Sequence, residues 1–275
     1  MNCITLLTDF GTVDEYVGVM KGVILTIHPA AAIVDICHDI PPGDIPSAAR
    51  MLTAAYGYFP RKTVHVCVVD PGVGTNRAVL AARADDHFFV APDNGILFPL
   101  LSRASVDNVV RVHNADFFLP EISRTFHGRD VLAPVAAHLL RGVSIADLGP
   151  PMPVDEMVSL ALPRPQAAPD GGFVGTVTGA DRFGNLLTNI ESRHIDPMTG
   201  RGEAIEILVG GVVIPGLSGN YGRLDGKTCL ALIGSRGILE IAVSGGSAKE
   251  RLKAKTGDPV TVRRKKIPEE MKQDS

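Results

Sequence analysis

The feature that most constrains this chain is an apolar run at residues 64–69 that stops abruptly on Asp70. The acid is followed by Pro71, Gly72, a Gly-X-Gly-Thr turn and Arg77. A buried strand that ends on a carboxylate puts that charge at the carboxyl edge of a sheet, where open α/β proteins bind ligands. The glycines allow backbone conformations that a side chain forbids, and they let a ligand approach closely. The stretch therefore predicts the floor of an active site.

The same order of apolar run, acid, glycine and hydroxyl occurs at Thr8-Asp9-Phe10-Gly11-Thr12. Strand-like runs and helix-like spacings alternate through the first 150 residues, which favours an α/β domain with a mostly parallel sheet flanked by helices. The expected helices are 14–28, with Asp14 as a possible cap, 45–58 and 130–141. The expected strands are 3–8, 33–37, 64–69, 79–83, 88–91 and 109–112.

The composition and pattern of the sequence change after residue 150. Prolines are dense over residues 151–171, which is typical of an extended connector. Short strand-like runs between glycines follow, and they indicate a small barrel or sandwich. We therefore expect an α/β domain at 1–150, a linker at 151–171, an all-β domain at 172–264 and a polar tail at 265–275.

Composition narrows the classes of partner. The 275 residues carry a net charge of −3, so no global field draws nucleic acid or an anionic membrane to the protein. No apolar run approaches the roughly 18 residues that a membrane helix needs, and the first residues lack the features of a signal peptide. The four cysteines lie in apolar runs without a Cys-X-X-Cys pair, which favours buried thiols in a reducing compartment. We expect a cytoplasmic protein with a small-molecule substrate.

Three side chains of the first domain are candidates for catalysis. Asp70 and Arg77 either flank a reacting centre or form an ion pair that pins the glycine turn. His127 follows Phe126 in a loop before Gly128, and histidine titrates near neutral pH. A lone histidine in a loop is usually just solvated, so this residue alone decides nothing.

Each candidate for ligand binding could instead have a purely structural role. Asp9 either holds the vicinal hydroxyls of a ribose or caps a turn. The Asp181–Asn185 stretch either reads a nucleobase or an amino acid, or it closes a hairpin. Ser235-Arg236 is either a polar clamp or a turn. A phosphate-binding loop, a nucleophile elbow, a complete dinucleotide fingerprint and metal-type histidine spacing are all absent, so we expect neither cofactor nor metal.

Together these stretches resemble the S-adenosylmethionine hydroxide adenosyltransferases, which are relatives of the fluorinating and chlorinating enzymes. The resemblance spans about residues 8–262 and is carried by six motifs in order. They are Thr8-Asp9-Phe10-Gly11, Val69-Asp70-Pro71-Gly72-Val73-Gly74-Thr75 with Arg77, Ala91-Pro92-Asp93-Asn94-Gly95, Thr125-Phe126-His127-Gly128-Arg129-Asp130, Asp181-Arg182-Phe183-Gly184-Asn185 and Gly234-Ser235-Arg236-Gly237.

This resemblance implies an α/β domain followed by a β-barrel, in a homotrimer whose active sites lie at subunit interfaces. It implies hydrolysis of S-adenosyl-L-methionine, without metal, by attack of water on ribose C5′, giving adenosine and L-methionine. The implied catalytic set is Asp70, Arg77 and His127. Asp9 would bind the ribose, and Asp181 and Arg236 the amino and carboxylate ends of methionine. The other implied substrate contacts are Asn185, Ser235, Glu240 and the backbone near Val243.

Two other functions stay open from the sequence. One is a halogenating transferase that uses the same substrate, but a carboxylate at Asp70 would repel a halide where the halogenating relatives have apolar or hydroxyl groups. The other is a protein that binds adenosine or S-adenosylmethionine without turning it over. A metal-dependent hydrolase built on the Asp-rich turns is a more distant alternative.

Overall fold

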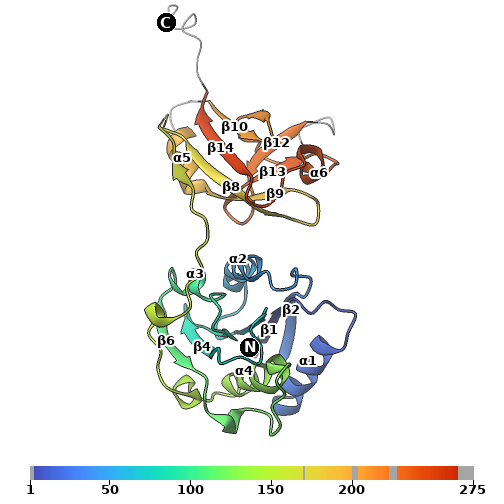
Figure 1. The fold of residues 1–275 in the computed structure, drawn as a ribbon, viewed down its shortest axis with the longest axis vertical. Helices are drawn as coiled ribbons and strands as arrows, with labels where there is room; N and C mark the ends of the chain where they lie inside the picture. Colours follow the sequence, from blue (N-terminus) through green and yellow to red (C-terminus); the bar gives the residue numbers. More distant parts are fainter. Residues whose placement is uncertain (1–2, 170, 200–203, 223–227, 266–275) are drawn as a thin grey trace, which may run out of the picture. The chain divides into compact units, whose positions relative to one another are not determined.

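The computed structural model of the protein describes residues 3–169, 171–199, 204–222 and 228–265 (Figure 1). The chain forms two compact units, which divide between Leu162 and Pro163. Within the described residues, no helix has the length and apolar character needed to cross a membrane.

A six-stranded sheet forms the centre of the first unit, in the order β2-β1-β3-β5-β4-β6. The α/β prediction is confirmed, but the sheet is mixed, because β4 runs antiparallel to both β5 and β6. Asp85 and Asp86 join β4 to β5 and both have positive φ, the conformation of a two-residue hairpin turn, which joins only antiparallel strands. The strands are β1 (Cys3–Thr8), β2 (Ala32–Cys37), β3 (Val64–Val68), β4 (Val79–Ala84), β5 (His87–Pro92) and β6 (Val106–Arg111).

Helices cover both faces of this sheet (Figure 1). Helices α1 (Tyr16–Ile27) and α4 (Ala133–Leu140) pack in one apolar core, and α2 (Ile45–Ala55) and α3 (Phe98–Leu101) pack in the other. The expected cap Asp14 is not used, since α1 begins after Glu15 without a side-chain cap. Short turns complete the unit: η1 (Tyr56–Tyr58), η2 (Ala115–Phe117), the π-helical η3 (Gly128–Leu132), η4 (Ile145–Leu148) and η5 (Val154–Glu156).

The connections place two acids at one crevice. From β1 the chain passes through α1 to β2 on one side, whereas β3 lies on the other side of β1. Such a reversal of strand order opens a crevice at the carboxyl ends of the strands. The parallel register pairs Thr8 with Val68, so Asp9 and Asp70 leave neighbouring strand ends at this point. Both strands are buried throughout, as expected for central parallel strands covered on both faces.

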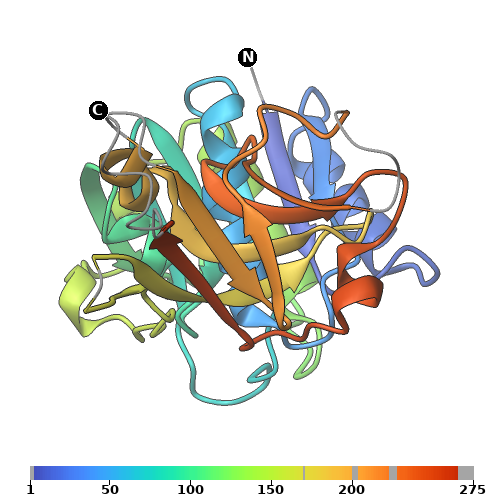
Figure 2. The same ribbon diagram turned by 90° about the horizontal axis from the view of Figure 1, so that it is seen from above.

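The second unit is an antiparallel sheet that curves into a nearly closed, barrel-like form, with its strands drawn from yellow to red in Figure 2. Its edge strands β11 and β12 approach each other, where the amide of Ser218 donates to the carbonyl of Ala231 at 2.7 Å. The strands are β7 (Gln166–Ala167), β8 (Phe173–Ala180), β9 (Leu186–Glu191), β10 (Ile205–Val209), β11 (Val212–Pro215), β12 (Cys229–Ile233), β13 (Ile238–Val243) and β14 (Pro259–Arg264). Two short helices, α5 (Ser192–Thr199) and α6 (Ala248–Leu252), accompany them.

The division between the units falls inside the expected linker 151–171. Residues up to Leu162 belong to the first unit, where Met152 and Met157 are buried in the core of its α2 face. The amide of Met152 donates to the carbonyl of Val109 and so ties this segment to β6. Of the expected polar tail, residues 266–275 lie outside the described part of the chain.

Candidate active site

Three predicted side chains meet at the carboxyl end of β3. Arg77 Nε donates to both carboxylate oxygens of Asp70, at 2.9 and 2.8 Å, and its Nη2 also contacts Oδ2. The same Nη2 lies 3.1 Å from Nδ1 of His127. The side chains of Asp70 and Arg77 are 5% and 9% exposed, so this fork-shaped pair is largely desolvated and well ordered. The structure therefore brings together an acid, a guanidinium and an imidazole from two distant segments.

The turn that carries Asp70 and Arg77 is held by its own bonds and by a neighbouring strand. Thr75 Oγ1 donates to the carbonyl of Gly72 at 2.7 Å, which closes the glycine turn. The side-chain amide of Asn94, from the turn after β5, donates to the carbonyl of Val69 at 2.8 Å. Asn94 thus fixes the end of β3. The sequence motif around Asn94 did not reveal this positioning role.

The loop that carries His127 is anchored by a fully buried acid. The carboxylate of Asp130 accepts a hydrogen bond from the amide of Ser123 at 2.8 Å and is paired with Arg129. Asp130 lies within the π-helical turn η3, where the sequence had predicted the start of a regular helix. A π-turn re-aims the side chains at its start, and such turns are frequent at functional sites.

His127 is held in its neutral form. Burial lowers its pKa, the adjacent guanidinium of Arg77 lowers it further, and Asp70 and Asp130 oppose the shift. Because arginine can only donate, its contact makes Nδ1 of His127 an acceptor and leaves the ring hydrogen on Nε2. An imidazole in this state presents an N–H group to a ligand or a solvent molecule.

Gly74 joins the two loops of this cluster. It has φ +79°, and a Cβ at this position would lie 2.4 Å from the carbonyl oxygen of Arg124, in the loop before His127. Gly74→Ala should therefore push the loops apart, destabilise the protein by about 1–3 kcal/mol and lower its activity. Thermal melting and turnover measure the two effects. Gly142→Ala is the matched control, since Gly142 has φ +96° but open space around its Cα. Equal losses in both variants would show that loop contact plays no part.

Asp9 does not cap a helix. Its Oδ2 accepts a hydrogen bond from the amide of Gly43 at 2.8 Å, and this bond ties the end of β1 to the loop after β2. Gly11 strengthens the same connection, because its amide donates to the carbonyl of His38 at 2.8 Å. The carboxylate of Asp9 is half-buried at the crevice, and within the described part of the chain its one hydrogen bond is the one from Gly43.

The predicted residues of the second unit gather around one cavity of about 690 Å³. They reach it from the β8–β9 turn, from the β12–β13 turn and from β13 itself. The six are Asp181, Asn185, Ser235, Arg236, Glu240 and Val243, and the remaining lining residues are Phe183, Leu187, Tyr221, Ser244, Gly245 and Gly246.

Within this cavity Asp181 is committed to its own turn. Its Oδ1 accepts from the amides of Phe183 and Asn185, both at 2.9 Å, and its Oδ2 accepts from the side-chain amide of Asn185 at 2.8 Å. These three bonds close the hairpin between β8 and β9. The structural alternative for this carboxylate is therefore present in the fold.

Two aromatic residues at the cavity were not predicted from the sequence. Phe183 is 78% exposed and Tyr221 is 45% exposed, which is unusual for large rings in short turns. Tyr221 donates its hydroxyl to Oε2 of Glu240 at 2.7 Å. Burial and Glu240 together raise the pKa of Tyr221 to about 12, so its hydroxyl stays protonated. The sequence signal that could have identified both residues is a bulky aromatic side chain inside a glycine-rich turn.

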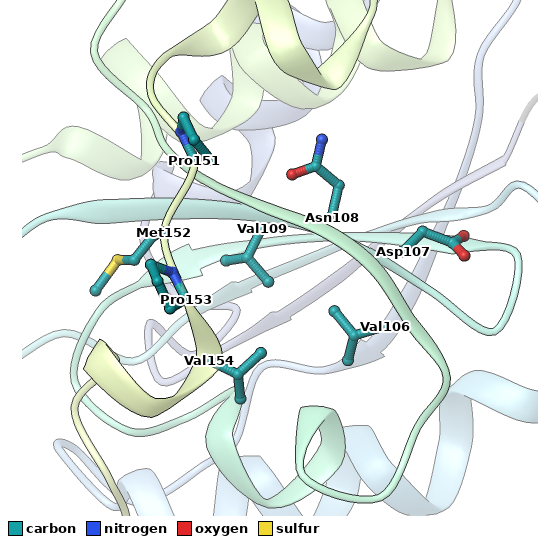
Figure 3. A pocket seen from close by; sticks show the side chains of 8 residues that line it. All are labelled: Val106, Asp107, Asn108, Val109, Pro151, Met152, Pro153 and Val154. Carbon is teal, nitrogen blue, oxygen red and sulfur yellow. The ribbon is translucent and has the colours of Figure 1, made fainter.

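A second cavity, of about 460 Å³, lies in the first unit between β6 and the segment after residue 150 (Figure 3). Its lining is mostly apolar, with the amide of Asn108 directed away from the valines. Asp107 on its rim is engaged by Arg83, at 3.2 Å. The cavity contains none of the predicted site residues; its lining is Val106, Asp107, Asn108, Val109, Pro151, Met152, Pro153 and Val154.

An α/β unit with an acid, a guanidinium and an imidazole at its crevice, followed by a barrel-like unit with a polar cavity, is the architecture of a two-domain enzyme. The chain belongs to the SAM hydroxide adenosyltransferase family. Its residues 4–149 match the N-terminal domain of that family and residues 175–261 match the C-terminal domain.

The sequences of several known proteins are similar to this chain over nearly its whole length. The "(R)-S-adenosyl-L-methionine hydrolase" of Salinispora tropica is 35% identical, with 94% of this chain and 97% of that protein covered. The protein of the same name from Thermus thermophilus is 37% identical, covering 94% and 99%. A fluorinase from Actinoplanes is more distant, at 27% identity over 94% and 96%. The crystal structure of an uncharacterised conserved protein from Thermotoga maritima superimposes with a TM-score of 0.88 at 35% identity, covering 95% and 100%.

Proposed function

We propose that this chain hydrolyses S-adenosyl-L-methionine to adenosine and L-methionine, with Asp70, Arg77 and His127 acting on the attacking water. The curated relatives that share more than a third of their residues with this chain are named as hydrolases of this substrate. The observation that carries the mechanism is the contact of these three side chains at the end of β3.

The leaving group departs without assistance, and the difficulty of the reaction lies in the weak nucleophile. A C5′–O bond forms as the C5′–S bond breaks, and the electron pair returns to the sulfonium, which leaves as a neutral thioether. Water is a poor nucleophile, so its orientation and the loss of its proton set the barrier. The Nε2 hydrogen of His127 orients the water, Asp70 accepts its proton, and Arg77 stabilises the developing hydroxide.

The charge of the cluster favours water over a halide. The carboxylate of Asp70 pairs with the guanidinium of Arg77, and burial together with Arg77 lowers the pKa of His127 and favours its neutral form, so the cluster offers an incoming anion no net positive charge. A halide would also meet the carboxylate at close range, where the low exposure of the site leaves the repulsion poorly screened. The same carboxylate is an acceptor for a proton of water.

In this proposal the substrate binds at a subunit interface, between the first unit of one subunit and the second unit of its neighbour. Asp9 takes the ribose hydroxyls, while Asn185, Ser235 and the backbone near Val243 take the rest of the nucleoside and the methionine. The exposed ring of Phe183 offers a face on which a base stacks. We extend the proposal to a closed β-barrel, to a cytoplasmic homotrimer with active sites at subunit interfaces, and to a reaction without cofactor, as the resemblance implies.

The test is to incubate the purified protein with S-adenosyl-L-methionine and EDTA in ¹⁸O-labelled water. We expect adenosine and L-methionine in equal amounts, with the label in the 5′-hydroxyl of adenosine. Parallel reactions with chloride or fluoride should give the same products. Heat-denatured protein is the control for spontaneous breakdown. Release of a 5′-halogenated nucleoside, or binding of substrate with no adenosine formed, would reject this function.

A further inference from the structure

The loop after β2 holds the strand end that carries Asp9 through three hydrogen bonds. Nδ1 of His38 lies 2.8 Å from the hydroxyl of Thr8, the residue directly before Asp9. The carbonyl of His38 accepts from the amide of Gly11, on the other side of Asp9, at 2.8 Å. The amide of Gly43 donates to the carboxylate of Asp9, also at 2.8 Å. One loop therefore contacts this carboxylate and the chain on both sides of it.

The imidazole of His38 is itself held from behind. His38 is 5% exposed and Thr8 is fully buried. Nε2 of His38 lies 3.1 Å from Oδ1 of Asp35, at a poor angle for a hydrogen bond, and Asp35 is paired with Lys21 at 2.6 Å. The negative charge beside Nε2 favours the ring hydrogen on that atom, which leaves Nδ1 to accept the hydroxyl hydrogen of Thr8. The hydroxyl oxygen in turn accepts from the amide of Phe10 at 3.3 Å.

A second threonine of β1 makes the same kind of contact away from the strand end. The hydroxyl of Thr5 lies 2.8 Å from Nδ1 of His65, and both residues are fully buried. Thr5 lies inside β1, whereas Thr8 is its last residue and is followed directly by Asp9. The two pairs thus share the same bond and similar burial, and they differ in whether they border the crevice.

We propose that His38 is a positioning residue that sets the orientation of Asp9 toward the ribose hydroxyls of the substrate. A carboxylate binds two vicinal hydroxyls well only when its orientation is fixed, because hydrogen bonds weaken steeply as their angles depart from the optimum. The bond between Thr8 and the imidazole keeps the end of β1 from rotating. The inference rests on the proposed function, because that function supplies the ribose.

The first test compares His38→Leu with His38→Asn in steady-state assays of adenosine release. Leucine fills much of the space of the ring but accepts no hydrogen bond, whereas the amide oxygen of asparagine takes the place of Nδ1. His38→Leu should raise KM for S-adenosyl-L-methionine about 10-fold and change kcat by less than about threefold. His38→Asn should restore most of the loss in KM. A rise in KM that asparagine does not relieve would show that the ring only fills space, and would overturn the inference.

The second test uses the two threonines of β1 as a matched pair. Thr8→Val and Thr5→Val each remove a buried hydroxyl that is bonded to a histidine, so each should lower the melting temperature by a similar amount. Only Thr8→Val should raise KM. Equal KM values in the two variants would reduce the contact of His38 with Thr8 to a structural role.

The third test asks whether His38 acts through Asp9. Asp9→Asn should raise KM, and His38→Leu added to it should raise KM by less than about a further twofold, because residues that act as a unit are not additive. The inference fails if His38→Leu has the same effect on KM in both backgrounds, or if it has none in the native protein. Either result leaves the proposed function intact when the native protein releases adenosine, whereas a native protein that releases none rejects the function itself.

Discussion

Replacing Asp70 with asparagine should lower kcat by about 10²–10⁴-fold, the range that one positioned general base contributes. The amide keeps the size of the side chain and one of the oxygens that Arg77 contacts, but it cannot accept a proton from water. The change leaves the predicted substrate contacts in place, so KM should change little. Steady-state release of adenosine, followed by chromatography, gives both constants.

Asp107→Asn is the matched control for this variant. Asp107 also pairs with an arginine, Arg83, but its side chain is 54% exposed and lies on the rim of the apolar cavity of β6. Its loss should change neither kcat nor stability appreciably, because exposed ion pairs contribute little. An Asp70→Asn protein that retains kcat within a factor of about three would show that this carboxylate is not the base.

The end of β3 could be predicted because its signals are local. A run of buried residues, an acid and two glycines within residues 64–77 define both the strand and the turn. The partner of this turn could not be found in the same way. His127 reaches Arg77 through a loop 50 residues further along, anchored by Asp130 and Ser123, and only tertiary packing creates that contact. The resemblance to a family supplied what spacing could not.

The direction of β4 shows a different limit. The sequence predicts strands at 79–83 and 88–91, but the positive φ of Asp85 and Asp86 between them makes the pair an antiparallel hairpin. Aspartate adopts this conformation less readily than asparagine or glycine. The residue types of the turn were therefore a weak signal for a hairpin. In the second unit, Asp181 accepts three hydrogen bonds within its own turn, and no sequence pattern reports that.

The second prediction with a large expected effect concerns the stability of the first unit in acid, and it rests on a pair of buried histidines. His65 on β3 is fully buried, with Nδ1 2.8 Å from the hydroxyl of Thr5 and Nε2 3.2 Å from Nδ1 of His87. Its ring stacks on Phe89 at 5.2 Å. Burial and the neighbouring His87 together lower the pKa of His65 to about 3. Burial also lowers the pKa of His87. Both rings are therefore expected to be neutral rather than cationic in the folded protein at neutral pH.

These histidines should make the first unit sensitive to acid. In the unfolded chain His65 titrates near 6.5, so below this pH the unfolded state binds a proton that the folded state refuses. The contribution of neutral His65 to stability is therefore complete above pH 6.5 and is lost progressively as the pH falls toward about 3. The full loss is on the order of 5 kcal/mol, with roughly half of it reached near pH 5.

Scanning calorimetry between pH 7 and pH 4 tests this expectation through the slope of the melting temperature. His65→Gln keeps a hydrogen-bonding group opposite Thr5 but cannot be protonated, so its melting temperature should fall less steeply with acid, whatever its value at pH 7. His113→Asn is the control, because His113 is exposed and its replacement should leave the slope of the native protein unchanged. If His65→Gln and the native protein lose stability in parallel, the carboxylates rather than this buried imidazole govern acid unfolding. Asp130 is such an acid, because its hydrogen bonds from Arg129 and Ser123 lower its pKa.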